Sequence, residues 1–303
     1  AENGQSASEV ELRQRVAKHP QSRTVRTPVT QPASWNPTEI FSRPVQNQGE
    51  GGNFGTEFWL VMQQNFDGTW SEEQAGMFID VTSRAVPTTG TIEIDGINFS
   101  QTFNVSPGQV TRIELPNDAE VRANDVPVEK AIHITAEDPI AVYGLSRIPF
   151  TTDGYLGLPE SVLSSDYLVA SYPNTTRFTV SSDALSQFAV VSPQNGTSVT
   201  ITPAGPTEGG RPAGQPFTVT LDEGEVYQVR SEIEPAADLS GSVVQSSAPV
   251  ALFSGNSCAD IPFDAGVGFC DALHEQMTPL STWGESYATR PLENRETGDT
   301  WRI

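Results

Sequence analysis

Three histidines are the residues in this chain best suited to acid–base chemistry, and none of them stands in a recognised catalytic motif. His274 begins the run His-Glu-Gln-Met-Thr, so Thr278 takes the place where a zinc-protease motif needs its second histidine. His19 falls in the N-terminal segment, and His133 alternates with two isoleucines, so it faces away from their side. The sequence contains no Gly-x-Ser-x-Gly turn to present a nucleophilic serine. We therefore expect no enzyme, with a hydrolase built from scattered Ser, His and Asp residues or from paired carboxylates as a minor alternative.

Cys258 and Cys270 are the only cysteines, and they could form a disulfide, a reactive thiol pair or part of a metal site. A structural zinc ion takes four ligands, of which two cysteines supply half. His274 and an aspartate could complete the set, but a chain rich in predicted strands argues against it. We expect a disulfide that constrains the unfolded chain by about 2–4 kcal/mol, with its loop on the surface.

Acidic residues cluster in two predicted turns and could hold Ca²⁺ weakly. The clusters are Asp118 with Glu120, and Asp222 with Glu223 and Glu225. Neither has the spacing of an EF-hand loop, and acidic turns exposed to solvent are far more common than calcium sites. The sequence therefore predicts no metal site, and no motif in it predicts a cofactor.

The chain of 303 residues is strongly acidic, with 17 Lys and Arg against 38 Asp and Glu, a net charge of −21. Such a charge repels phosphate backbones and anionic membrane surfaces, which excludes nucleic-acid binding as an expected function. No apolar run is long enough for a membrane helix, so we expect no membrane insertion. The first residues, Ala-Glu-Asn, are typical of a mature secreted protein after signal cleavage.

One apolar sequence motif occurs twice in the body of the chain. Asp-Pro-Ile-Ala-Val-Tyr-Gly at 138–144 returns as Ala-Pro-Val-Ala-Leu-Phe-Ser-Gly at 248–255, about 110 residues later, as expected for a repeat. In each occurrence we expect the proline to open the strand, where its missing N–H does least harm. Three further landmarks recur in the same order: 57–61 with 166–170, 106–110 with 222–226, and Gly90-Thr91 with Gly196-Thr197.

Short alternating runs between Gly and Pro turns predict strands throughout this body, and nothing between them has a helical period. The predicted strands are 56–63, 77–82, 91–95, 99–105, 110–115, 131–136 and 140–145, then 167–171, 177–181, 188–192, 199–202, 217–221, 226–230, 243–246 and 250–254. The fold class is therefore all-β, with two tandem antiparallel β-sandwich units of about 110 residues.

Five regions follow from this pattern. They are an extended arm with a short helix (1–52), a first sandwich unit (53–158), a second (159–257), a disulfide loop and connector (258–284), and the first strands of an incomplete third unit (285–303). The arm is rich in Pro, Thr, Gln and Arg, and only 24–27 and 39–42 in it are able to pair as strands. We expect the arm to dock on an open β edge.

Several stretches taken together resemble the N-terminal region of the IgG Fc-binding protein family, a module found in large secreted proteins, many of them bacterial. These are residues 55–65, 135–144, 152–159, 238–241, 248–255, 270–279 and 281–284, of which Cys-Asp-Ala-Leu-His-Glu-Gln-Met-Thr-Pro at 270–279 is the best match. The resemblance implies an extracellular or cell-surface recognition module without catalytic residues. Its expected partners are an extracellular protein or glycoprotein, or copies of itself, in an adhesion role. The alternative is a structural subunit of a filament or surface coat, assembled by strand exchange through the arm.

Overall fold

The computed structural model describes residues 52–66, 76–149, 151–176, 184–263 and 269–284. Within these residues every regular element is a β-strand or a single 3-10 turn, and none is a helix able to span a membrane. The predicted arm up to residue 51, with its short helix, and the predicted third unit at 285–303 lie outside the described residues.

Unit one is an antiparallel sandwich built around one long strand, β9. The first half of β9 pairs with β1 and β4, and its second half pairs with β3 and β10. β5 extends the first sheet beyond β4, and β6 extends the second beyond β3. The strands are β1 (Gly55–Leu60), β3 (Gly76–Ser83), β4 (Thr88–Ile94), β5 (Phe99–Val105), β6 (Val110–Leu115), β9 (Ile132–Ile148) and β10 (Thr151–Gly157).

Unit two has the same plan around its own long strand, β16. β11 and β13 pair with the first half of β16, and β12 and β17 pair with the second, while β14 and β15 lie beyond β13 and β12. The strands are β11 (Ser164–Leu168), β12 (Ser186–Val191), β13 (Thr197–Thr202), β14 (Phe217–Leu221), β15 (Val226–Arg230), β16 (Val243–Ala259) and β17 (Asp271–Gln276). The fold class expected from the sequence is confirmed, and β17 falls within the region predicted as a connector.

Pro139 and Pro249 lie in the middle of β9 and β16, not at the start of a strand as the sequence analysis expected. Both are exposed, at the point where the long strand leaves one sheet and joins the other. A proline is tolerated there because its missing N–H interrupts no ladder at the crossing. Each pair of predicted strands on either side is therefore one continuous strand.

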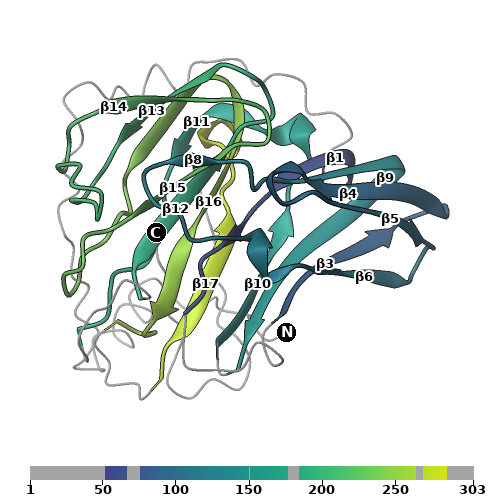
Figure 1. Cartoon of the computed structure of the whole chain (residues 1–303), viewed down its shortest axis with the longest axis horizontal. Helices are drawn as coiled ribbons and strands as arrows, with labels where there is room; N and C mark the ends of the chain where they lie inside the picture. The colour runs from purple at the N-terminus through teal and green to yellow at the C-terminus, as the bar shows by residue number, and fades with distance from the viewer. Residues whose placement is uncertain (1–51, 67–75, 150, 177–183, 264–268, 285–303) are drawn as a thin grey trace, which may run out of the picture.

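Short elements join the two units, which lie side by side in Figure 1. β8 (Pro127–Val128) pairs with β15 of unit two, while β2 (Met62–Gln63) pairs in parallel with β7 (Glu120–Val121) within unit one. One apolar core cluster contains residues of both units, including Val191, Val226 and Phe253 from unit two. The units are therefore packed through a shared core.

The 3-10 turns are Asp95–Ile97, Asn117–Ala119, Glu160–Val162 and Leu280–Thr282.

Candidate functional site

The polar residues of β17 hold the edge of β10, which belongs to the other unit. Oδ1 of Asp271 accepts a hydrogen bond from the N–H of Thr152 at 2.7 Å. Oδ2 of Asp153 accepts one from the N–H of His274 at 2.6 Å. Two edge strands are therefore bridged by carboxylates where a backbone ladder is absent, and their N–H groups are satisfied without leaving an open edge.

Two further hydrogen bonds complete this contact. Oε1 of Gln276 accepts the N–H of Leu158 at 2.6 Å, and Oγ1 of Thr151 accepts the N–H of Ala272 at 2.9 Å. We call residues 151–153, 158 and 271–276 the clasp. The run at 270–279 that is most characteristic in the sequence thus serves to join the two units.

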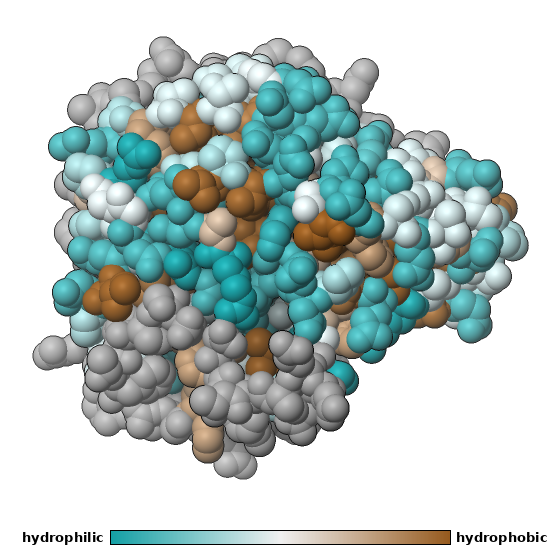
Figure 2. Space-filling view, in the orientation of Figure 1, coloured by the Kyte–Doolittle hydropathy of each residue, from teal (hydrophilic) through white to brown (hydrophobic). Residues whose placement is uncertain are grey.

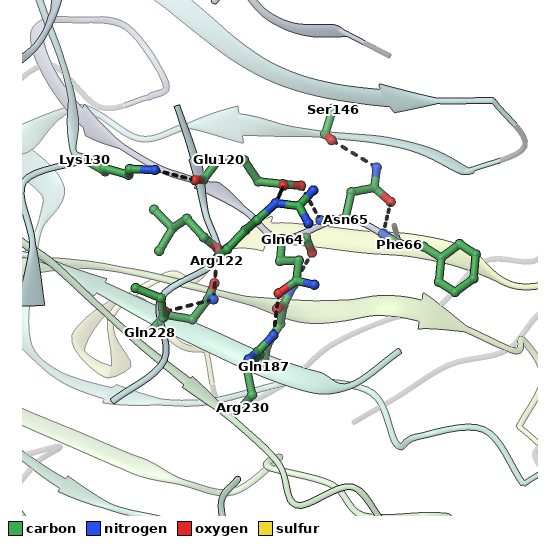
Figure 3. Close-up of polar contacts among 12 residues, drawn as sticks. Gln64, Asn65, Phe66, Glu120, Arg122, Lys130, Ser146, Gln187, Gln228 and Arg230 are labelled. Carbon is green, nitrogen blue, oxygen red and sulfur yellow. Dashed lines mark hydrogen bonds and ion pairs between the residues drawn. The ribbon is translucent and has the colours of Figure 1, made fainter. Parts of the chain in front are cut away.

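Asn65, whose hydrogen bond to Ser146 is drawn in Figure 3, connects the clasp to the interior of unit one. Its Nδ2 donates to Oγ of Ser146 at 3.0 Å and to the carbonyl of Thr151 at 3.3 Å, while its Oδ1 accepts from Oγ1 of Thr151 at 2.9 Å. Its own N–H donates to Oε1 of Glu120 at 2.8 Å. Because Asn65 is fully buried, each of these bonds satisfies a group that water cannot reach.

Gln64 makes the corresponding contacts to unit two (Figure 3). Its carbonyl accepts hydrogen bonds from Nε2 of Gln187, at 2.8 Å, and from the ring of His274. Its side-chain oxygen accepts from Arg230, whose guanidinium also pairs with Glu208 at 2.7 Å. A buried polar network of this kind fixes one relative arrangement of the two units.

The chemistry of His274 follows from its burial. Burial lowers the pKa of His274 to about 4, and the hydrogen bond to the carbonyl of Gln64 only partly opposes that shift. The ring is therefore neutral at physiological pH. Its Nε2 has no hydrogen-bond partner among the described residues, so no hydroxyl or carboxylate there forms a catalytic pair with it. His274 acts as a positioned donor in the junction.

A cavity of about 370 Å³ adjoins the clasp, lined by Asp153, Tyr172, Leu273 and Glu275 among others. Burial raises the pKa of Asp153, against the effect of the hydrogen bonds from the N–H groups of His274 and Gly154. Burial raises the pKa of Glu275, and the negative charge of Asp153 raises it further. Because Asp153 is already engaged by two backbone donors, it is a structural acceptor and not a free general base.

A second cluster, which the sequence analysis missed, lies on the outer side of β1 and β9. The rings of Trp59 and His133 stack with centroids 3.9 Å apart, and Nε2 of His133 lies 3.0 Å from Oε1 of Glu57. Nε1 of Trp59 donates to Oε2 of Glu160 at 2.9 Å, and burial raises the pKa of that carboxyl group. The alternation of His133 in its strand predicted which side it faces, but only the strand register brings it opposite Trp59.

Cys258 and Cys270, the only site residues predicted from the sequence, are bonded to each other. Their Cα atoms are 5.0 Å apart, and they join the end of β16 to the residue before β17. Cys258 is fully buried and Cys270 is partly exposed. The disulfide therefore ties the clasp strand to the centre of unit two.

The acidic turns make local hydrogen bonds. Oδ1 of Asp222 accepts the N–H of Gly196, and Oε2 of Glu225 accepts the N–H of Asp222. Glu120 pairs with Arg122 at 2.6 Å. In the described part of the chain, no group of three or more His, Cys, Asp or Glu residues is arranged to hold a metal ion.

Fold and junction together define an all-β, disulfide-bonded module in which buried polar residues join two sandwich units. Comparison with known proteins gives the family. The family model described as IgGFc binding protein matches residues 153–303, and the human IgGFc-binding protein is 30% identical over 268 residues, 88% of this chain. The chain belongs to the IgG Fc-binding protein family. It spans 5% of the length of the human relative, and no solved structure matches it.

Proposed function

We propose that the chain is a non-catalytic, extracellular protein-binding module that acts in adhesion to a protein or glycoprotein. The observation that carries this proposal is the similarity to a protein named for binding the Fc region of immunoglobulin G, over most of the chain. The disulfide supports an oxidising, extracellular setting, since disulfides persist mainly in secreted and surface proteins. The carboxylates of Asp153 and Asp271 in the junction are engaged by backbone N–H groups, which supports a binding role over a catalytic one.

Surface plasmon resonance on the immobilised chain tests this proposal. The probes are an IgG Fc fragment, the Fab fragment of the same antibody as a matched control, and a purified mucin as a heavily glycosylated protein. The expected result is saturable binding of Fc or mucin, with no binding of Fab, at Kd values of about 1–100 µM, a range typical of weak single modules. Absence of binding to Fc and mucin at about 100 µM would count against the proposal.

A structural subunit of a filament or coat, assembled by strand exchange, is the second candidate. β5 and β14 end their sheets with one side unpaired by any named strand, which is the geometry that an added strand needs. The arm segments 24–27 and 39–42, predicted to supply such a strand, lie outside the described residues. Filaments seen by electron microscopy with the whole chain, and lost on deletion of residues 1–50, would favour this candidate over adhesion.

A further inference from the structure

The outer face of one sheet of unit two is the surface that packs on unit one. This sheet consists of β15, β12, β16 and β17. At one end of the face Val226, Val191 and Ala251 stand side by side and are fully buried in the core cluster of unit one. Two residues further along β16 on the same face, Phe253 is 1% exposed. Its ring contacts that of Tyr155 edge-on, with the ring centroids 5.2 Å apart. The face is therefore part of the protein interior.

Unit one has the same face, on β6, β3, β9 and β10, because its strands pair in the same register. Val110, Thr82 and Ala141 occupy the row that corresponds to Val226, Val191 and Ala251. Arg112, Asp80 and Tyr143 occupy the row that corresponds to Gln228, Ala189 and Phe253. We call this surface the open face.

Burial differs sharply between the two faces. Val110 is 66% exposed where its counterpart Val226 is buried, and Tyr143 is 43% exposed where its counterpart Phe253 is buried. Val110 and Tyr143 are thus uncovered at positions where another unit of the fold covers their counterparts, whereas Ala141 is buried like its counterpart Ala251. Exposed apolar and aromatic side chains on a face that is an interface elsewhere in the same molecule indicate a binding surface.

The open face carries two arginines, Arg112 and Arg147, and two carboxylates, Asp80 and Glu114, in a chain whose net charge is −21. The guanidinium groups of Arg112 and Arg147 lie over the ring of Phe78, at 4.9 and 5.4 Å from its centroid. Arg112 is paired with Asp80 through two hydrogen bonds of 2.7 Å. Arg147 is therefore the charge on this face from which an acidic group of a partner would gain, since Arg112 is already paired with Asp80.

Besides β10, the connection 116–131 between β6 and β9 also covers unit two. Its strand β8 pairs with β15. Asn124 accepts the N–H of Arg230 at 2.9 Å, and Asp125 accepts the hydroxyl of Tyr227 at 2.6 Å. The connection thus follows the edge strand β15, and Nε2 of Gln228, on the covered face, donates to its carbonyls of Val121 and Ala123 at 3.0 and 3.4 Å.

The counterpart of this connection in unit two is 231–242, between β15 and β16. It is shorter, and it carries Ile233, which is 44% exposed, between Glu232 and Glu234, with Asp238 following. An exposed apolar residue flanked by carboxylates complements a surface with an exposed tyrosine, a valine and two arginines. On the side in view, Figure 2 shows apolar residues in small groups among hydrophilic ones.

We propose that a second copy of this chain docks its 231–242 connection on the open face, repeating between copies the packing that joins the two units within one copy. The two surfaces in contact are different, so each copy can bind one neighbour on each side and the assembly is head-to-tail. This contact uses side-chain packing and charge, and it is independent of strand exchange through the N-terminal arm.

Sedimentation velocity of the whole chain, over a concentration series up to about 500 µM, is the first test. The weight-average sedimentation coefficient should rise with concentration. It should rise less at high salt, because screening weakens exposed charge pairs. Tyr143→Glu blocks the open face and Ile233→Glu blocks the connection, so each variant alone should remain monomeric. An equimolar mixture of the two should form a dimer and nothing larger, since one intact surface of each kind remains.

Val86→Glu is the matched control, because Val86 is 45% exposed in the β3–β4 turn and lies outside both surfaces. It should associate as the unmodified chain does. Arg147→Glu replaces Tyr143→Glu if the latter lowers the unfolding midpoint. A chain that is monomeric at every concentration, or a Tyr143→Glu variant that associates normally, would overturn the proposal. Association that occurs only after residues 1–51 are deleted would overturn it too, by showing that this segment occupies the face.

Discussion

The carboxylate of Asp153 accepts the backbone N–H of His274 across 121 residues of sequence, at 2.6 Å. The two residues stand on edge strands of different units, and their contact replaces the backbone pairing that either edge lacks. Asp271 makes the reciprocal bond to Thr152 at 2.7 Å. Two crossed bonds of this kind fix both the separation of the strands and their register.

Gln276→Ala should weaken the clasp. The substitution leaves the N–H of Leu158 without its acceptor in a partly buried position, and an unsatisfied group of this kind costs about 1–3 kcal/mol. Urea unfolding followed by tryptophan fluorescence measures the change in free energy of unfolding. Thr278→Ala is the matched control, because Thr278 is exposed just beyond β17 and should change that free energy by less than about 0.5 kcal/mol. Equal effects of the two substitutions would contradict the role given to Gln276.

His274 should make the protein less stable in mild acid. Its pKa in the folded chain is about 4, below the 6.5 of an exposed histidine, so the unfolded chain takes up a proton that the folded chain does not. Stability is therefore lost as the pH falls from about 6.5 towards 4, by an amount on the order of 3 kcal/mol. Asp153 and Glu275 act in the opposite sense, since their raised pKa values favour protonation of the folded state.

His274→Gln separates these contributions, because it keeps a donor near the carbonyl of Gln64 and does not titrate. The free energy of unfolding, measured in urea at pH 7 and pH 4.5, should fall more for the unmodified chain than for the variant. The two carboxyl groups are present in both proteins, so the difference between the slopes belongs to His274. Identical slopes would show that the ring is not buried in its neutral form.

The disulfide should be complete and stabilising. Thiol labelling of the denatured, unreduced chain should find no free thiol, because Cys258 and Cys270 are bonded to each other. Replacing both by serine should lower the free energy of unfolding by about 2–4 kcal/mol. Reduction of the unmodified chain should lower it by a similar amount, and two reactive thiols before reduction would contradict the pairing.

The sequence predicted the fold class because the long central strands repeat a buried pattern. Ile140 lies opposite Gly55 and Val250 lies opposite Ser164, so these two landmarks hold the same register position in the two units. The comparison of Gly90-Thr91 with Gly196-Thr197 was wrong by three residues, since Thr91 and Thr200 are the true counterparts. A glycine beside a threonine is too common in turns to fix a register. That the units are copies of one ancestral repeat stays a prediction.

The clasp could not be predicted, because its strands lack the apolar alternation by which strands are recognised. The family motifs in the sequence contain these polar residues but assign them no role. They are Thr152 and Asp153 in β10, and Asp271 and Gln276 in β17. Their role depends on the packing of two units, which a local pattern does not encode. The exposure of Tyr143 could not be predicted for the same reason. Its sequence neighbours resemble those of Phe253, but Phe253 is covered by the other unit and Tyr143 is not.

Val142→Ala and Leu252→Ala should each destabilise the whole described body, because both side chains are fully buried at corresponding positions of β9 and β16. Each should cost about 2–4 kcal/mol. The two lie in different core clusters, but Phe253, the neighbour of Leu252, packs in the cluster of Val142. Unfolding of the units should therefore be coupled, and either substitution should shift one common transition in a calorimetric scan.

Tyr143→Ala and Phe253→Ala test the same coupling on the other side of the strands. Tyr143 is exposed, so its truncation should change the free energy of unfolding by less than about 0.5 kcal/mol. Phe253 is buried between the units, so its truncation should cost about 3–5 kcal/mol and shift the common transition. Two separate transitions, with Val142→Ala lowering one and Leu252→Ala the other, would show that the units unfold independently despite their shared core.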